Sequence, residues 1–148
     1  STNSNASKDL ILNSEAKSFL KETAKWTYFF SILGFIGVGL FVLLGVFASV
    51  IFSFIGQAAT GMDEISPNIL GLIYIAMAAL YFFPVYYLYN FSKNIKAALQ
   101  LNDNILLNKA FENLKSHYKF IGIFTLVIIA SYVLSLLFFF AIGFTAFV

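Results

Sequence analysis

Three long segments of the chain contain no acid, no lysine and no histidine. They comprise 37 residues between Lys25 and Asp63, 28 residues between Glu64 and Lys93, and 29 residues after Lys119. A hydrocarbon core about 30 Å thick takes roughly 20 helical residues, and only helical backbones satisfy their polar groups within it. Each segment therefore predicts one membrane-spanning helix. The three expected spans run approximately over residues 26–56, 67–91 and 119–147.

The composition agrees with a membrane protein. Of 148 residues, 60% are apolar and 11% are charged. A soluble chain of this length has too little charge to cover so much apolar surface. We expect one polytopic domain, residues 1–148, of the all-α membrane class.

The positions of the nine lysines predict the orientation. Four precede the first span, five lie between the second and third spans, and none lies in the loop 57–66. Because cytoplasmic loops carry an excess of lysine, the N-terminus and the second connection are expected in the cytoplasm. The C-terminus is then expected on the outer side.

Amphipathic helices are predicted next to the membrane. The segment of about 8–25 has apolar side chains at helical spacing, and this apolar face continues into the first span. The connection 92–118 contains two such apolar stripes, separated by the polar sequence QLNDN. These patterns predict an amphipathic N-terminal helix, a cytoplasmic helical hairpin and a small core between them. A competing picture bends the first helix onto the membrane surface. The apolar face of that helix consists of Leu12, Ala16, Phe19, Thr23, Trp26 and Phe30.

Small residues in the first span predict a helix-packing face. Small side chains let two helices approach closely in lipid. The partner of this face is open: another span of the chain, a second copy or a different protein. The face consists of Gly34, Gly37, Gly45, Ala48, Ser49 and Gly56.

The stretch LYFFPVYYLYNF, residues 80–91, is typical of an interfacial aromatic belt, because its aromatic side chains point in every direction around a helix. A ligand-binding box, the competing interpretation, would gather them on one face. Pro84 removes one helical hydrogen bond and predicts a kink. The expected contacts with lipid headgroups are Trp26, Lys93, Lys96, Lys115 and Lys119.

Few residues are suited to catalysis or metal binding. The chain has no cysteine, no arginine and one histidine, so we expect no catalytic, cofactor or metal site and no nucleic-acid partner. His117 fits an interfacial residue at headgroup level; a pH sensor, or a base paired with Glu112, is the alternative. The expected partners are the bilayer and either the chain itself or other membrane subunits.

Three stretches resemble a family of small inner-membrane proteins of Bacteroidetes-type bacteria that is catalogued as a domain of unknown function. They are SFLKETAKW (18–26), LYFFPVYYLYNFSKNIKAAL (80–99) and NLKSHYKFIGI (113–123). The resemblance runs from about residue 15 to the end of the third span. It implies a bacterial inner-membrane location, with the C-terminus in the periplasm, and no particular activity or cofactor.

Two functions fit these features. The first is a non-enzymatic structural or interaction protein, either a homo-oligomer or an accessory subunit of a larger inner-membrane complex. The alternative is a passive channel or small transporter formed by oligomerisation. The polar residues expected along a channel axis are Ser49, Ser53, Ser131 and Ser135.

Overall fold

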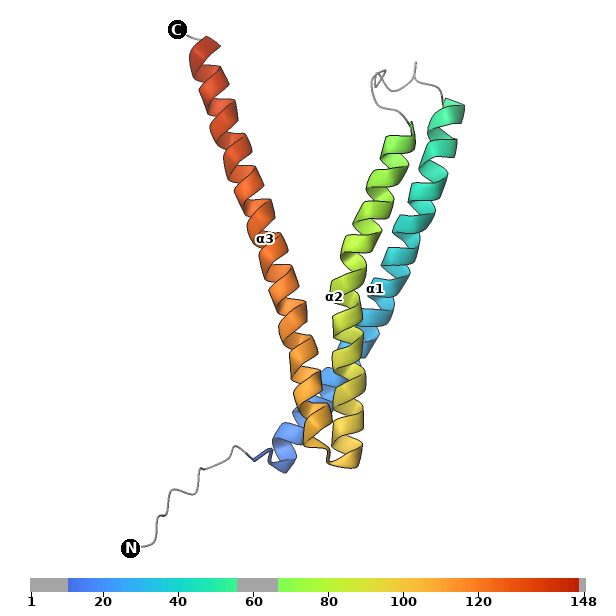
Figure 1. Ribbon diagram of the computed structural model, residues 1–148, viewed down its shortest axis with the longest axis vertical. Coiled ribbons are helices and arrows are strands. Elements are labelled where there is room, and N and C mark those ends of the chain that lie inside the picture. Colours follow the sequence, from blue (N-terminus) through green and yellow to red (C-terminus); the bar gives the residue numbers. More distant parts are fainter. Residues whose placement is uncertain (1–10, 56–66, 147–148) are drawn as a thin grey trace, which may run out of the picture.

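A computed structural model describes residues 11–55 and 67–146, and it consists of three long helices. Each is long and apolar enough to span a membrane, which confirms the prediction of three candidate spans and indicates a multi-pass membrane protein. In Figure 1, α1 and α2 run side by side, whereas α3 diverges from them. The helices are α1 (Ser14–Ile55), α2 (Pro67–Leu101) and α3 (Asn104–Ala146).

The start of α1 is fixed by a side-chain cap. The Asn13 carboxamide oxygen accepts a hydrogen bond of 2.8 Å from the backbone N–H of Ala16. Asparagine is among the preferred capping residues because it satisfies a donor that has no partner within the helix. From there α1 continues without a break to Ile55, so the predicted N-terminal helix and first span form one helix.

The turn between α2 and α3 needs only two residues. Asn102 has a positive φ of 50°, a conformation that asparagine tolerates better than most residues. The Asp103 N–H bonds back to the Ala98 carbonyl at 3.1 Å, as in a Schellman motif. The Asp103 carboxylate then accepts from Ile105 N–H at 2.7 Å and caps α3. Asp103 is thus the cap of α3, and Asn102 reverses the chain.

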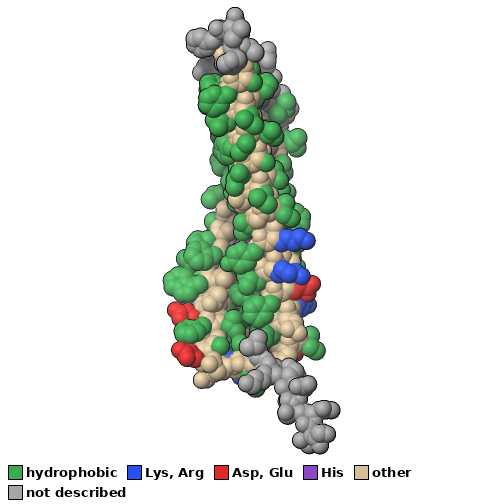
Figure 2. Space-filling model, turned by 90° about the vertical axis from the view of Figure 1, so that its left-hand side faces the viewer, with side chains coloured by type: hydrophobic (Ala, Val, Ile, Leu, Met, Phe, Trp, Pro, Cys, Tyr) green, Lys and Arg blue, Asp and Glu red, His purple; other side chains and the backbone are tan. Residues whose placement is uncertain are grey.

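The end of the molecule that holds this turn, called here the junction end, contains the charged side chains of the described residues. Figure 2 shows charged groups on the lower half of the face that carries α3, and apolar side chains above them. The helices have 42, 35 and 43 residues. At 1.5 Å per residue they measure about 50–65 Å, well beyond a hydrocarbon core of about 30 Å. Each therefore has a section outside the bilayer.

A small apolar core joins all three helices at the junction end. It contains Ala24 of α1, Phe91 and Ile95 of α2, and Ala110 of α3, all at most 1% exposed. The two predicted stripes of the hairpin supply the α2 and α3 members. The partly buried side chains around this core are Leu20, Leu99, Leu107 and Leu114.

The face that α1 contributes to this core differs from the prediction. Phe19, Trp26 and Phe30, which form the predicted stripe, are more than half exposed, whereas Ala24 and Ser31 are buried completely. Only small side chains fit at this crossing, because the Ser92 hydroxyl of α2 bonds directly to the Ala24 carbonyl. The aromatic stripe faces away from the core.

The backbones of α1 and α2 also approach each other closely within the apolar part of the two helices. A Cβ atom built on Gly71 would lie 2.7 Å from the Gly45 carbonyl oxygen, closer than real Cβ atoms come. The aromatic rings of Phe41 and Tyr81 stack with centroids 5.7 Å apart. These contacts keep the two helices together along most of their length.

The third helix packs on α2 only near the junction end. The Cα atoms of α1 and α3 stay more than 8 Å apart throughout the described residues. From Thr125 to Ile142 every side chain of α3 is exposed in the single chain. The molecule is consequently V-shaped, with α1 and α2 forming one arm and α3 the other (Figure 1).

Candidate binding grooves where the three helices meet

The point at which α3 leaves α2 is marked by a contact between His117 and Pro84. Nδ1 of the half-buried imidazole lies 2.7 Å from the Pro84 carbonyl oxygen. A carbonyl only accepts hydrogen bonds, so Nδ1 must carry the proton and donate it. The ring of Phe120 lies 6.2 Å from that of Phe83 one turn further along. The two contacts fix the register of α3 against α2.

This contact was not foreseen from the sequence, because 33 residues separate its partners. His117 was interpreted as an interfacial side chain on its own helix, and Pro84 as a kink. In the structure α2 continues as a helix through Pro84, which is buried. The register that brings the two together is set by the two-residue turn and by the junction core.

The neutral form of His117 is expected to be the Nδ1–H tautomer, because its partner is a carbonyl oxygen. In long-range ¹H–¹⁵N NMR spectra of the protein in micelles, Nδ1 should show the shift of a protonated nitrogen and Nε2 that of an unprotonated one. A Ser116→Ala variant is a suitable control, since the Ser116 hydroxyl bonds to its own helix at the Glu112 carbonyl. Detection of the Nε2–H tautomer alone would contradict the contact.

An apolar cavity of about 310 Å³ lies beside this contact. His117 is its principal polar group, and the other walls are apolar or aromatic side chains of α2 and α3. A cavity of this character accepts a hydrocarbon chain rather than a polar solute. Its lining comprises Leu80, Tyr81, Pro84, Val85, Leu88, His117, Phe120, Ile121 and Phe124.

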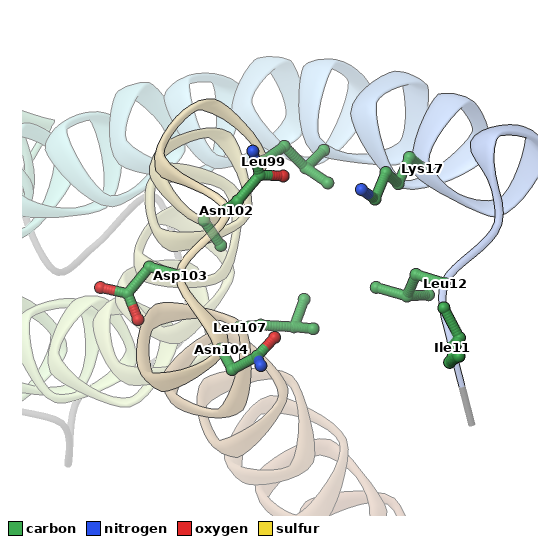
Figure 3. Close-up of a pocket in the computed structure, with 9 residues that line it drawn as sticks. Ile11, Leu12, Lys17, Leu99, Asn102, Asp103, Asn104 and Leu107 are labelled. Carbon is green, nitrogen blue, oxygen red and sulfur yellow. The ribbon is translucent and has the colours of Figure 1, made fainter. Parts of the chain in front are cut away.

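A second hollow, the junction notch, lies where α1 begins and α2 turns into α3. Its volume is about 360 Å³. Figure 3 shows Lys17 reaching into the notch from α1, opposite Leu99 and Asn102, while the Asp103 carboxylate points away. The Asp103 carboxylate caps the start of α3 instead of reaching toward Lys17. Among the described residues, the notch combines apolar side chains with polar ones and with the ammonium group of Lys17.

A third hollow, the lysine groove, adjoins the junction notch along α1 and α2. It measures about 430 Å³ and shares Lys17 and Leu99 with the notch. Two successive turns of α1 and the last turns of α2 provide its walls. The lining residues are Ser14, Lys17, Ser18, Lys21, Lys96, Leu99 and Gln100.

The residues of the predicted helix-packing face have different environments. Gly34 lies against Val85, with a virtual Cβ 2.6 Å from that side chain, and Gly45 lies against the backbone of Gly71. Ala48 is 8% exposed. A Cβ on Gly37 would have no neighbour within 4 Å. The helix brought against this face is α2; the Ser49 side chain and Gly56 lie outside the described residues.

The residues predicted to contact lipid headgroups are all exposed. Trp26 packs edge-on against Phe29, with ring centroids 6.2 Å apart. Lys96 differs from the other lysines because its ammonium nitrogen lies 4.2 Å from the centre of the Tyr28 ring. One of these predicted lysines, Lys96, lines the lysine groove, together with Lys17 and Lys21 of α1.

No set of acids and histidines suited to a metal occurs among residues 11–55 and 67–146. Comparisons with protein-family models, with curated proteins and with solved structures found no match. The resemblance to a family of small inner-membrane proteins stays a prediction.

Proposed function

We propose that this chain is a non-enzymatic membrane protein of structural or interaction type, acting as a homo-oligomer or as an accessory subunit of a larger complex. The observation that supports this proposal is the isolated outer half of α3. Within the described residues, every side chain from Thr125 to Ala141 is exposed. Helices in lipid gain stability from close packing and from interhelical hydrogen bonds. Among the described residues, no Cα atom of α1 lies within 8 Å of one in α3, and the outer half of α3 diverges from α2 (Figure 1). A helix of another subunit beside α3 would supply close packing and hydrogen bonds.

The level of the bilayer follows from the register of the helices. The contact between Phe83 and Phe120 brings Lys119 of α3 to the level of Phe83 on α2. Gly34 of α1 is at nearly the same level, because it lies against Val85. Lys119 is the last charged residue of α3 before its apolar section. We infer that the hydrocarbon core begins near this level.

The lengths of the helices support that boundary. From Gly34 to Ile55, α1 measures about 33 Å, and from Pro67 to Pro84, α2 measures about 27 Å, both close to the hydrocarbon thickness. Tyr86 and Trp26 then lie in the interfacial layer, where amphipathic rings are favoured. With the lysines at the junction end, this end is the cytoplasmic one in our proposal, and the membrane is the inner membrane of a bacterium.

Cross-linking between copies tests the homo-oligomer directly. Because the chain has no cysteine, a single cysteine at Leu134 of α3, 66% exposed, reports on a neighbouring copy. Oxidation in native membranes should give a disulfide-linked dimer that is visible after denaturing electrophoresis. A cysteine at Phe47 on the outer side of α1, 54% exposed, is the matched control and should give much less dimer.

The accessory-subunit form of the proposal predicts a different result. No dimer would form, but purification in mild detergent would bring down another membrane protein in fixed proportion. Mass photometry of the purified sample separates these outcomes. A monomer that retains only lipid in mild detergent, together with no cross-link at Leu134, would overturn the proposal.

A further inference from the structure

We propose that the lysine groove between α1 and α2 is a binding site for a phosphate-bearing anion. Three lysines line it, Lys17 and Lys21 from α1 and Lys96 from α2. The proposal concerns this groove alone and does not depend on the oligomeric state of the protein.

The groove is formed by residues that are distant in the sequence. Lys17 and Lys21 are one helical turn apart and thus share a face of α1. The packing of Ala24 against Ser92 brings that face opposite the last turns of α2, where Lys96 lies. Ser14, Ser18 and Gln100 complete the rim and add hydrogen-bonding groups beside the ammonium groups. Such a convergence of donors suits the oxygens of a phosphate.

The charge of the groove is uncompensated within the described residues. Its lining contains no carboxylate, and none of its three lysines forms a salt bridge there. Like charges one helical turn apart repel, and a third ammonium group across the groove adds to that repulsion. An anion bound among them would remove it. Basic pockets between helices on the cytoplasmic side of a membrane are known to bind phosphate headgroups.

One of the three cations is held in position. The Lys96 ammonium nitrogen lies 4.2 Å from the centre of the Tyr28 ring, a cation–π arrangement that restricts a flexible side chain. Tyr28 itself packs on Tyr89, with ring centroids 5.9 Å apart. The aromatic pair thereby restricts the Lys96 ammonium group to the side of the groove on which Tyr28 lies.

Two sources supply the same chemistry. Phospholipid headgroups carry phosphate at the membrane surface, and soluble phosphate compounds carry it in the cytoplasm. Lys96 lies about 18 Å along α2 from Pro84, beyond a headgroup layer of about 5–8 Å, so the groove faces the water next to the membrane surface. The probes that distinguish the sources are pyrophosphate and phosphatidylglycerol, with phosphatidylcholine as a headgroup of no net charge.

The test is isothermal titration calorimetry of the full chain in a neutral detergent. Pyrophosphate is titrated as a solute, and each lipid is titrated in mixed micelles. At least one of the two anions should bind, and the variant K17Q/K21Q/K96Q should weaken that binding about 100-fold or more, since each charge-assisted contact contributes about tenfold. Binding of pyrophosphate assigns the site to soluble phosphates; binding of phosphatidylglycerol alone assigns it to lipid.

The matched control carries the same change of charge on α3. The variant K109Q/K115Q/K119Q removes three lysines that do not line the groove, and it should change the affinity for pyrophosphate less than about threefold because exposed charges at a distance are screened. Equal losses in the two variants would show a general effect of charge and overturn the proposal. Failure of both anions to bind the unaltered chain would overturn it as well. Circular dichroism of both variants confirms that the exposed substitutions leave the helices intact.

Discussion

Replacement of Gly71 by leucine is expected to separate α1 from α2 and to lower the free energy of unfolding by about 3 kcal/mol, the upper part of the range for overpacked sites. Even a Cβ atom at Gly71 would stand 2.7 Å from the Gly45 carbonyl oxygen. That neighbour is backbone and has no rotamer by which to move away. The remaining side-chain atoms of leucine enlarge the clash. Unfolding in bicelles, followed by steric trapping, measures the change.

Gly37 provides the matched control on α1. A Cβ at Gly37 meets nothing within 4 Å, so Gly37→Leu adds the same atoms without a backbone clash at Cβ. Leucine also favours helix over glycine by nearly 1 kcal/mol, and this gain applies to both variants. Gly37→Leu should therefore leave the stability unchanged or raise it. Equal effects of the two substitutions would show that α1 and α2 do not approach as closely as described.

Truncation of Ile95 is expected to loosen the junction end. Its side chain is completely buried between the three helices, so Ile95→Ala should cost about 2–5 kcal/mol through lost burial and the cavity left behind. In our proposal this core lies outside the hydrocarbon, where burial is driven by the full hydrophobic effect. Hydrogen–deuterium exchange should show faster exchange of amides around the α2–α3 turn than in the unaltered protein.

Ile105→Ala is the control for this second prediction. Ile105 belongs to the first turn of α3, close to the same core, but it is 78% exposed. Its truncation should change the stability by at most about 0.5 kcal/mol, as is usual for exposed positions. If Ile95→Ala were equally mild, the three helices would not share a core at this end.

The number of spans and the position of the hairpin could be predicted from the sequence. Charge-free runs longer than 20 residues leave few alternatives, and the stripe containing Phe91 and Ile95 has the helical period of a buried face. The short polar run at 100–104 indicated the turn. Each of these signals is local, so no knowledge of the partner helix was needed.

The buried face of α1 was not predictable by the same rule. In a soluble helix the large apolar side chains mark the inner face, but near a membrane they also face lipid and headgroups. At the crossing with α2, Ala24 and Ser31 lie inside while Trp26 lies outside. Small residues, rather than aromatic ones, mark the inner face of such a helix.

The divergence of α3 and the contact between His117 and Pro84 also escaped the sequence pattern. The outer half of α3 is apolar on every side, so its sequence gives no preferred face and no angle. The histidine contact depends on the register between two helices, which a single sequence does not show. Both features follow from where the junction core ends and α3 loses contact with α2.

A stiff helix anchored at one end behaves as a lever. The junction core and the two-residue turn hold the base of α3, and the bond to Pro84 is close to the last point of attachment to α2. A rotation of about 5° at the last attachment moves the far end of α3, about 40 Å beyond it, by about 3.5 Å. The outer tip of α3 should therefore be the most sensitive place to read any small rearrangement that a ligand or a substitution causes among the helices at the junction.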